Sequence, residues 1–403
     1  MTQGELALSV NRSSSTVSTH IARLKEAGVL DSRDLKVGSR RAVRLAPDVA
    51  VLAGVTVYHR GVRGIVTNAL YEPLEDAWFD RSLDVSDPVA TLSIVAGQLA
   101  ERFRELEVGR ATTVPVAIGL PTPVNVGTQS LPTPYGLEKW ERLQPGLLLE
   151  KQLEQDHGLS TRVFIHNDAS LGALGCFHVE VARSVERGRS MARRPHEPLV
   201  YVRVSDGIGM GLIINGVLYG GAKGYAGEFG HVKTRESRAY CKRCGRDGCL
   251  EAVASTSVLL QALRERGIAS AQDTIHDVLD MKNSEAVRLL RGAGKAVGAA
   301  LAHATTLLNP RRIVIGGAPS KSREFMRSLE RELRAEALPE TFVTPITAAA
   351  ALGTGSQNGA GEHPYPELAG AVVYASQRAV SETLESRIDE YVRSTPSELL
   401  LDA

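Results

Sequence analysis

The sequence predicts an α/β protein with two lobes, preceded by a small α+β domain at the N-terminus. The chain is 403 residues long, which exceeds what one compact core needs. Beyond residue 47, apolar strand-like runs alternate with helical stretches, and the first 45 residues have a pattern of their own. We therefore expect four segments, at residues 1–47, 48–170, 171–370 and 371–403.

The elements of the two lobes follow from these runs. In the first lobe we expect strands at residues 51–57, 61–68 and 114–120 and a helix at 88–106. In the second we expect strands at 199–204, 211–214 and 313–317 and a long helix at 286–308. The Arg-rich stretch 182–198 predicts an exposed loop, with a phosphate contact as the alternative. Residues 371–392 look helical, and both packing on the first lobe and extending a dimer stay open.

Composition excludes several classes of protein. Hydrophobic residues make up 43% and charged residues 23%, and no apolar run is long enough to span a bilayer. No secretory signal is recognisable at the N-terminus, so we expect a cytoplasmic protein without a membrane partner. The net charge is only +1, but residues 1–45 hold eight Lys or Arg against four acids, a local charge of +4.

The N-terminal segment has the pattern of a DNA-binding winged helix. Leu6 and Val10 predict a short first helix, and Ser13 or Ser14 can cap a second one in which Val17, Ile21 and Leu24 form the buried face. A basic hairpin with Gly38 at its turn and Arg44 nearby follows as the wing. The alternative is that this basic segment forms only a solvent-exposed helical cap on the rest of the protein and does not bind DNA. The residues expected to contact DNA are Ser15, Thr16, Ser18, Thr19, His20, Arg23, Arg40 and Arg41.

One histidine and three cysteines that lie close together in the sequence predict a bound metal ion. His231, Cys241, Cys244 and Cys249 supply one imidazole and three thiolates within 19 residues, and nearby glycines permit tight turns. Four protein ligands leave no position for a bound water, so we expect a structural Zn²⁺. The alternative is a set of reduced free thiols. Cys176 stands apart and is expected to be a buried thiol.

The motifs together resemble the ROK family (repressor, open reading frame, kinase). The resemblance runs through the winged helix, Gly119-Leu120-Pro121-Thr122-Pro123, Asn167-Asp168-Ala169, Gly207-Ile208-Gly209-Met210-Gly211, the zinc cluster up to Glu251, and Ile315-Gly316-Gly317. It implies an actin-like, ribonuclease-H-like sugar kinase fold after the winged helix-turn-helix domain. It also implies that Asn167, Asp168, Glu228, His231 and Glu251 bind a sugar between the lobes.

The resemblance gives Asp168 a second role, as the general base of phosphoryl transfer. The alternative is an exposed loop residue that caps the following helix. Where ROK kinases have Asp-x-Gly-Gly-Thr, this chain places Thr56 at the acidic position and Tyr58 and His59 at the glycines. Asp206 adds negative charge to a second phosphate-type loop, so ATP and Mg²⁺ are not expected to bind.

Two further departures concern the ligand and the metal. Thr133 stands where sugar kinases of the family commonly have Asn, and the gap between Cys241 and Cys244 is one residue longer than usual. The first of these departures leaves the identity of the sugar open. The departures at Thr56, Tyr58, His59 and Asp206 imply a degenerate sugar kinase without activity. The leading hypothesis is a repressor that senses a sugar or sugar phosphate and binds operator DNA as a homodimer or dimer of dimers. The alternatives are an ATP-dependent, glucokinase-like sugar kinase and a DNA-binding scaffold without a small ligand.

Overall fold

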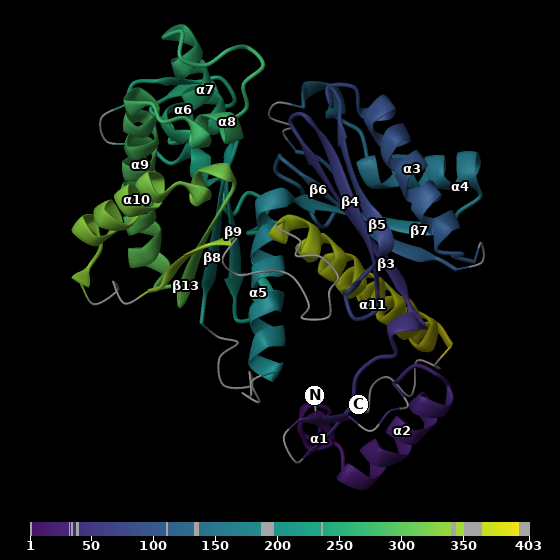
Figure 1. Cartoon of the computed structure of the whole chain (residues 1–403). Coiled ribbons are helices and arrows are strands. Elements are labelled where there is room, and N and C mark those ends of the chain that lie inside the picture. The colour runs from purple at the N-terminus through teal and green to yellow at the C-terminus, as the bar shows by residue number, and fades with distance from the viewer. Residues whose placement is uncertain are drawn as a thin grey trace.

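The computed structural model consists of two lobes side by side, with a small helical domain beneath them (Figure 1). It describes residues 2–31, 33, 35–37, 40–109, 112–132, 137–186, 197–234, 237–339, 344–349 and 365–394. The Arg-rich stretch at 182–198 begins inside a helix, and its residues 187–196 lie outside the described ranges.

The N-terminal domain contains two helices and a two-stranded sheet. Helix α1 (Gln3–Ser9) starts from a capping box formed by Thr2 and Glu5, and Ser13 caps α2 (Ser14–Glu26) by accepting from the amide of Thr16. Strands β1 (Leu35–Val37) and β2 (Arg40–Ala42) pair antiparallel, with Val37 opposite Arg40. Gly38, the expected turn residue, lies outside the described residues.

A small apolar core holds this domain together. Ala7, Val17 and Ile21 are its buried members. Leu24, which was expected on the buried face of α2, is 41% exposed. That expectation was wrong because the two short helices bury only a narrow stripe of α2.

The first lobe is built on a five-stranded sheet in the order β5-β4-β3-β6-β7. Its strands are β3 (Val51–Tyr58), β4 (Gly61–Asn68), β5 (Pro73–Ser82), β6 (Val114–Leu120) and β7 (Thr161–Asn167). Strands β3, β4 and β5 run antiparallel as a meander, whereas β3, β6 and β7 are parallel. Helices α3 (Pro88–Glu105) and α4 (Pro145–His157) pack on each other, and the short η2 (Glu138–Trp140) contributes Trp140 to the core.

The second lobe repeats a five-stranded sheet, in the order β10-β9-β8-β13-β14. The strands are β8 (Leu199–Val204), β9 (Ile208–Ile214), β10 (Val217–Leu218), β13 (Arg312–Gly316) and β14 (Ile346–Ala348). Its helices are α6 (Glu251–Ala254), α7 (Thr256–Glu265), α8 (Ile275–Asp280), α9 (Ser284–Leu308) and α10 (Arg323–Glu336). Short elements η4 (Phe229–His231), β11 (Tyr240–Cys241), β12 (Arg246–Asp247) and η5 (Ala318–Lys321) connect them.

Strand β9 begins three residues earlier than the sequence predicts. Residues 205–209 were expected to be a phosphate-type loop, but the strand begins at Ile208. Its glycines serve a different purpose. A Cβ at Gly211 would lie 2.2 Å from the carbonyl oxygen of Ala169 in α5 (Asp168–Glu186), so glycine is needed for the helix to approach the strand.

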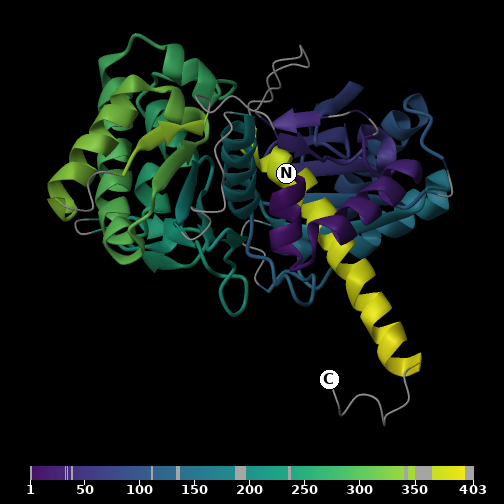
Figure 2. The same cartoon turned by 90° about the horizontal axis from the view of Figure 1, so that it is seen from below.

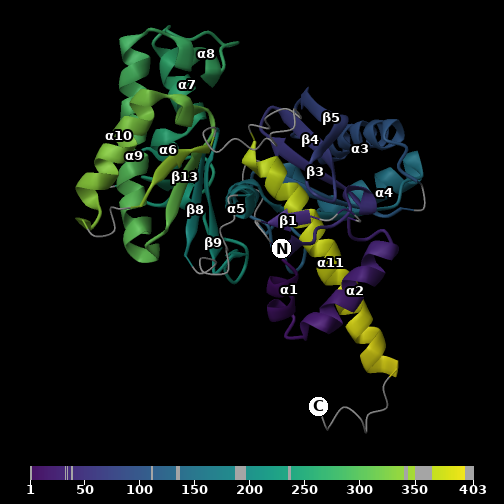
Figure 3. The same ribbon diagram turned by 60° about the horizontal axis from the view of Figure 1, so that its bottom comes forward.

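Two helices lie between the sheets. Helix α5 packs on β8 and β9, while α11 (Pro366–Ser394) packs on β3 and β6, and the two helices pack on each other. Figure 2 shows α11 starting between the lobes and extending past the first lobe, and Figure 3 shows α1 and α2 well away from α9 and α10. The C-terminal helix therefore starts at Pro366 and packs on the first lobe, which was one of the two possibilities left open by the sequence.

Candidate functional site

A polar cleft opens between the lobes at the carboxyl ends of β3, β6 and β7. Its cavity volume is about 40 Å³ in this arrangement of the lobes, and charged or polar side chains make up most of its lining. All five predicted sugar-binding residues line it: Asn167, Asp168, Glu228, His231 and Glu251. Three basic residues that were not expected there as ligand contacts, His59, Arg203 and Arg243, line it as well.

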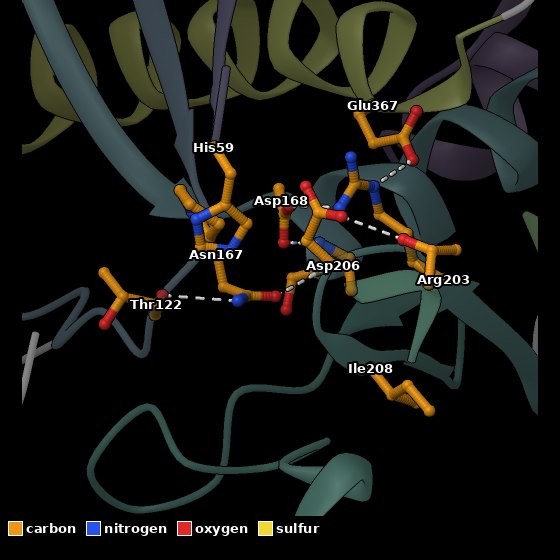
Figure 4. Close-up of polar contacts among 12 residues, drawn as sticks. His59, Thr122, Asn167, Asp168, Arg203, Asp206, Ile208 and Glu367 are labelled. Atoms are coloured by element: carbon orange, nitrogen blue, oxygen red, sulfur yellow. Dashed lines mark hydrogen bonds and ion pairs between the residues drawn. The ribbon is translucent and has the colours of Figure 1, made fainter. Parts of the chain in front are cut away.

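Asn167 and Asp168 enter the cleft at the junction of β7 and α5 (Figure 4). Asn167 donates from Nδ2 to the carbonyl oxygen of Thr122 at 3.2 Å, and its Oδ1 accepts from the amide of Ser170 at 3.0 Å. Asn167 therefore caps α5. Asp168 is only 6% exposed, so the alternative of an exposed loop residue is wrong.

The carboxylate of Asp168 is held by an arginine from the opposite lobe. Arg203 Nη1 lies 3.1 Å from Asp168 Oδ2, and Arg203 Nε lies 3.0 Å from Oε1 of Glu367 at the start of α11. Tyr201 donates to the same oxygen of Glu367 at 2.7 Å. Burial raises the pKa of Asp168, and the guanidinium of Arg203 counters this effect in part. The only sequence signal for Arg203 was a charged residue inside the apolar strand at 199–204.

Glu228 and Glu251 form the second-lobe side of the cleft. Glu251 Oε2 accepts from the amide of Ile208 at 3.0 Å. Burial, with a further contribution from Glu251, raises the pKa of Glu228 to about 7. The cleft thus carries several closely spaced carboxylates, which are hydrogen-bond acceptors suited to the hydroxyls of a polyol.

The predicted metal ligands lie close together beside the second-lobe side of the cleft. The ligand atoms of His231, Cys241, Cys244 and Cys249 all lie within 4.8 Å of one another, so this cluster could bind a metal ion. His231 Nδ1 faces Cys241 Sγ at 3.8 Å, while its Nε2 lies 3.8 Å from Glu228 Oε2. One imidazole nitrogen thus points to the thiols and the other to the cleft. Cys176, in contrast, is buried within α5, where burial raises the pKa of its thiol.

The candidate DNA-binding face lies on α2. All six residues of α2 that were predicted to contact DNA have exposed side chains: Ser15, Thr16, Ser18, Thr19, His20 and Arg23. The backbone of Arg40 and Arg41 forms β2, and their side chains lie outside the described residues. Arg44 binds Asp31 with an Nη2 to Oδ2 distance of 2.9 Å, which fixes it to the domain instead of leaving it available to a phosphate.

Comparison with known proteins places these features in one family. The ROK family profile matches residues 100–361, and a winged helix-turn-helix DNA-binding profile matches residues 1–31. The chain belongs to the ROK family. The prediction of the family, and of its two-lobed fold after a winged helix, is thereby confirmed.

Among ROK relatives, the xylose repressor of Bacillus subtilis is 25% identical over 305 residues, 75% of this chain and 74% of the repressor. A glucokinase of Halalkalibacterium halodurans is 29% identical over 209 residues, covering 47% of this chain and 59% of the enzyme.

Two solved structures share the fold. A ROK family transcriptional regulator described as a homologue of the E. coli MLC protein has a TM-score of 0.67 at 18% identity, covering 93% of this chain and 92% of its own. A Streptomyces griseus glucokinase, solved with glucose and AMPPNP, has a TM-score of 0.59 at 20% identity, covering 81% of this chain and all of its own.

The chain departs from the ROK kinase pattern where β3 turns into β4. Tyr58, the last residue of β3, pairs with Gly61 and donates to Asp80 Oδ1 at 2.7 Å, so it lies outside the cleft lining. Of the two residues at the glycine positions of the kinase pattern, His59 faces the cleft and Tyr58 does not. The Nε2 atom of His59 contacts Nη2 of Arg243. Burial, followed by the charge of Arg243, lowers the pKa of His59 to about 4. His59 is therefore neutral near pH 7 and accepts a hydrogen bond from Arg243.

The sequence analysis singled out two other residues, Asp206 and Thr133. Asp206 lies in the turn between β8 and β9, where Thr256 Oγ1 donates to its Oδ1 at 2.9 Å. Thr133 lies outside the described residues. Among the described residues, no helix is long and apolar enough to cross a bilayer.

Proposed function

We propose that this ROK protein is a transcriptional repressor that binds operator DNA through its winged helix and senses a monosaccharide in the interlobe cleft. One observation carries the proposal: the DNA-binding domain joins the cleft-bearing lobe through a single short connection that is held at both ends. The amide of Ala46 donates to Val29 O at 3.0 Å, and the amide of Ala69 donates to Pro47 O in η1 (Pro47–Val49) at 2.9 Å. In this proposal, a change in the first lobe acts on the winged helix through this connection. The similarity to xylose repressors supports the same conclusion.

In this proposal the sugar binds among the residues that converge on the cleft. Asn167 and Asp168 come from the first lobe, and Glu228, His231 and Glu251 come from the second. A ring with several hydroxyls can donate to the carboxylates and contact groups of both lobes at once. Such a ligand favours the arrangement of lobes in which all these contacts form, which is the condition for it to shift a conformational equilibrium.

DNA binding is assigned to the exposed polar face of α2. Small Ser and Thr side chains allow the helix to approach base edges, while Arg23, Arg40 and Arg41 neutralise phosphates. We propose that two copies bind a palindromic operator, because a two-fold dimer places two recognition helices on successive major grooves. Sedimentation of the protein with and without a duplex site measures this stoichiometry.

We further propose that Zn²⁺ occupies the His231, Cys241, Cys244 and Cys249 cluster. The donor set of three thiolates and one imidazole suits a tetrahedral structural zinc. The ion would fix the loop that carries β11 and β12 and keep Nε2 of His231 directed at the cleft.

The zinc proposal predicts the effect of removing thiols. In the double variant Cys244→Ser, Cys249→Ser, bound zinc falls from about one equivalent to almost none, and the melting temperature falls because folding no longer gains the binding energy of the ion. Mass spectrometry of the metal content and thermal unfolding measure both effects. Cys176→Ala is the matched control, because it removes a buried thiol that lies outside the cluster. An unchanged zinc content in the double variant would show that the metal assignment is wrong.

The competing function is an ATP-dependent sugar kinase, which similarity to glucokinases suggests. We propose that the chain lacks this activity. Asp168 is already bound to Arg203, so it would have to leave that ion pair to act as a base. His59 and Arg243 also meet at the hairpin where a kinase needs glycines near the phosphates.

The experiment that tests the function measures DNA binding and turnover together. A duplex selected by the protein from a random library is titrated in the presence of D-xylose, D-glucose or other monosaccharides. We expect one sugar to weaken DNA binding about tenfold or more, and no ADP to form when ATP and Mg²⁺ are added. Arg23→Ala should weaken DNA binding without changing sugar binding, since Arg23 is exposed on α2. Sugar-dependent ADP formation would instead identify a kinase.

A further inference from the structure

Arg243 stands between two cavities. The interlobe cleft lies on one side, and a larger cavity of about 770 Å³ lies on the other. The larger cavity is lined by Arg60, Asp206, Lys242 and residues of α7. Three residues line both cavities: His59, Arg243 and Glu251. These three side chains, here called the partition, stand between the two cavities.

The partition is held by contacts from both lobes. Arg243 Nε lies 3.0 Å from Glu251 Oε1, its Nη2 contacts His59 Nε2, and its Nη1 lies 3.5 Å from the carbonyl oxygen of Pro121. The Arg243 side chain is only 18% exposed. Gly207 leaves room for it, because a Cβ there would lie 2.9 Å from Glu251 Oε2 and 3.0 Å from Arg243 Nη2. The guanidinium therefore has a fixed position.

The charges on the cleft side of the partition favour an uncharged ligand. Both arginines of the cleft already bind carboxylates: Arg203 binds Asp168 and Glu367, and Arg243 binds Glu251. A phosphate would have to displace one of these carboxylates and would then lie near Glu228. Hydroxyl groups face no such penalty, because they can donate to the same oxygens.

We propose that Arg243, positioned by His59 and Glu251, is a specificity residue that restricts the cleft to one unphosphorylated sugar ring. This inference rests on the proposed sugar-sensing function. Removal of the side chain at either end of the Arg243–His59 contact would join the two cavities. A second ring or a phosphate group could then extend from the cleft into the larger cavity, which is lined by Arg60 and Lys242 as well as by acidic residues.

The test compares ligands of one series on a small set of variants. Calorimetry with D-glucose, D-glucose 6-phosphate and cellobiose, or with the equivalent series for the sugar that binds best, gives the affinities. For the natural sequence we expect binding of the single neutral sugar and about a hundredfold weaker binding of the other two. In Arg243→Ala and in His59→Ala, this discrimination, measured as the ratio of the affinities for the single sugar and for the other two ligands, should fall about tenfold.

Matched controls separate specificity from damage to the fold. Lys242→Ala removes the exposed neighbour of Arg243, which lines only the larger cavity, and should leave the discrimination unchanged. Arg243→Lys keeps the positive charge and most of the length of the side chain and should still exclude cellobiose. Metal content and melting temperature should match those of the natural sequence. His59→Ala provides an independent test if Arg243→Ala disturbs the loop between Cys241 and Cys244.

Two outcomes would overturn the inference alone. Equal affinity of the natural sequence for the free and phosphorylated sugar would show that the partition does not select. Unchanged discrimination in both alanine variants would show that other residues are responsible for it. If the natural sequence binds no monosaccharide, the proposed sensing function fails as well.

Discussion

At the scale of single residues, the most consequential feature is how many charged or titratable groups are buried near the junction of β7 and α5. His166 is 5% exposed, its Nδ1 accepts from the amide of Asn167 at 2.8 Å, and its ring meets that of Tyr374 edge-on with 4.9 Å between centroids. Burial lowers the pKa of His166 to about 4. The folded protein therefore keeps this imidazole neutral at a pH where an unfolded chain would protonate it.

This pKa predicts an acid-dependent loss of stability. Between pH 6.5 and pH 4 the unfolded state binds the proton more readily, so the free energy of unfolding falls as the pH falls. From pH 7 to pH 5 the contribution of His166 should fall by about 2 kcal/mol. In His166→Gln the pH dependence should be shallower by this amount, as measured by urea unfolding at both pH values. His20→Gln, an exposed control, should keep the original dependence, and an equal dependence in all three proteins would contradict the prediction.

How far the site could be predicted depends on the sequence distance between its members. The His231 to Cys249 cluster was visible because its four ligands fall within 19 residues, and the sequence could also place Asn167 and Asp168 by their motif. The partner of Asp168 could not be foreseen. Arg203 and Glu367 are 164 residues apart and meet only because β8 and the start of α11 pack together, and no local pattern records such a contact. The same holds for Arg243 and His59, which are 184 residues apart.

At the scale of elements, the sequence predicted strands and long helices well and misread glycines. The runs at 51–57, 61–68, 114–120 and 286–308 correspond to β3, β4, β6 and most of α9. Gly207 and Gly209 were assigned to a phosphate loop because glycine permits close approach to a phosphate. In the fold, a Cβ at Gly209 would lie 3.0 Å from the Cβ of Ala169, so the close neighbour of this glycine is a helix, α5. Sequence alone cannot tell which kind of group approaches a glycine.

The crossing of α5 and α11 depends on glycine in the same way. A Cβ at Gly370 would lie 1.8 Å from the carbonyl oxygen of Leu171, and a Cβ at Gly175 would lie 2.0 Å from that of Pro366. Both obstacles are backbone atoms, which cannot rotate away. The two helices can therefore cross at this distance only without side chains at these positions.

We predict that Gly370→Ala destabilises the protein by about 1–3 kcal/mol, because the added methyl forces α11 away from α5. Thermal or urea unfolding measures the change. Gly97→Ala in α3 is the control, because a Cβ there meets no atom within 4 Å. That control should stabilise the protein by up to about 1 kcal/mol through the higher helix propensity of alanine. Equal stability of Gly370→Ala and the natural sequence would show that the helices shift at no cost.

At the scale of the whole molecule, the proposed ligand and DNA sites are joined through the packing of the two lobes. In the cleft, Asp168 of the first lobe pairs with Arg203 of the second. Arg203 also pairs with Glu367 at the start of α11, and this helix packs along β3. The winged helix is attached just before β3. A sugar that favours one arrangement of the lobes thus acts on the same strand that leads to the DNA-binding domain.

If this coupling operates at equilibrium, it must be reciprocal. A sugar that weakens DNA binding by some factor must itself bind more weakly, by the same factor, to the protein saturated with DNA. We predict that the dissociation constant of the sugar rises about tenfold when the selected duplex is present in excess, as measured by calorimetry at fixed salt. A duplex of scrambled sequence at the same concentration should leave it unchanged, provided the salt is high enough to suppress nonspecific binding. If the sugar binds equally well with and without the specific duplex, then sugar and DNA binding are not coupled at equilibrium, and the proposed sensing function is wrong.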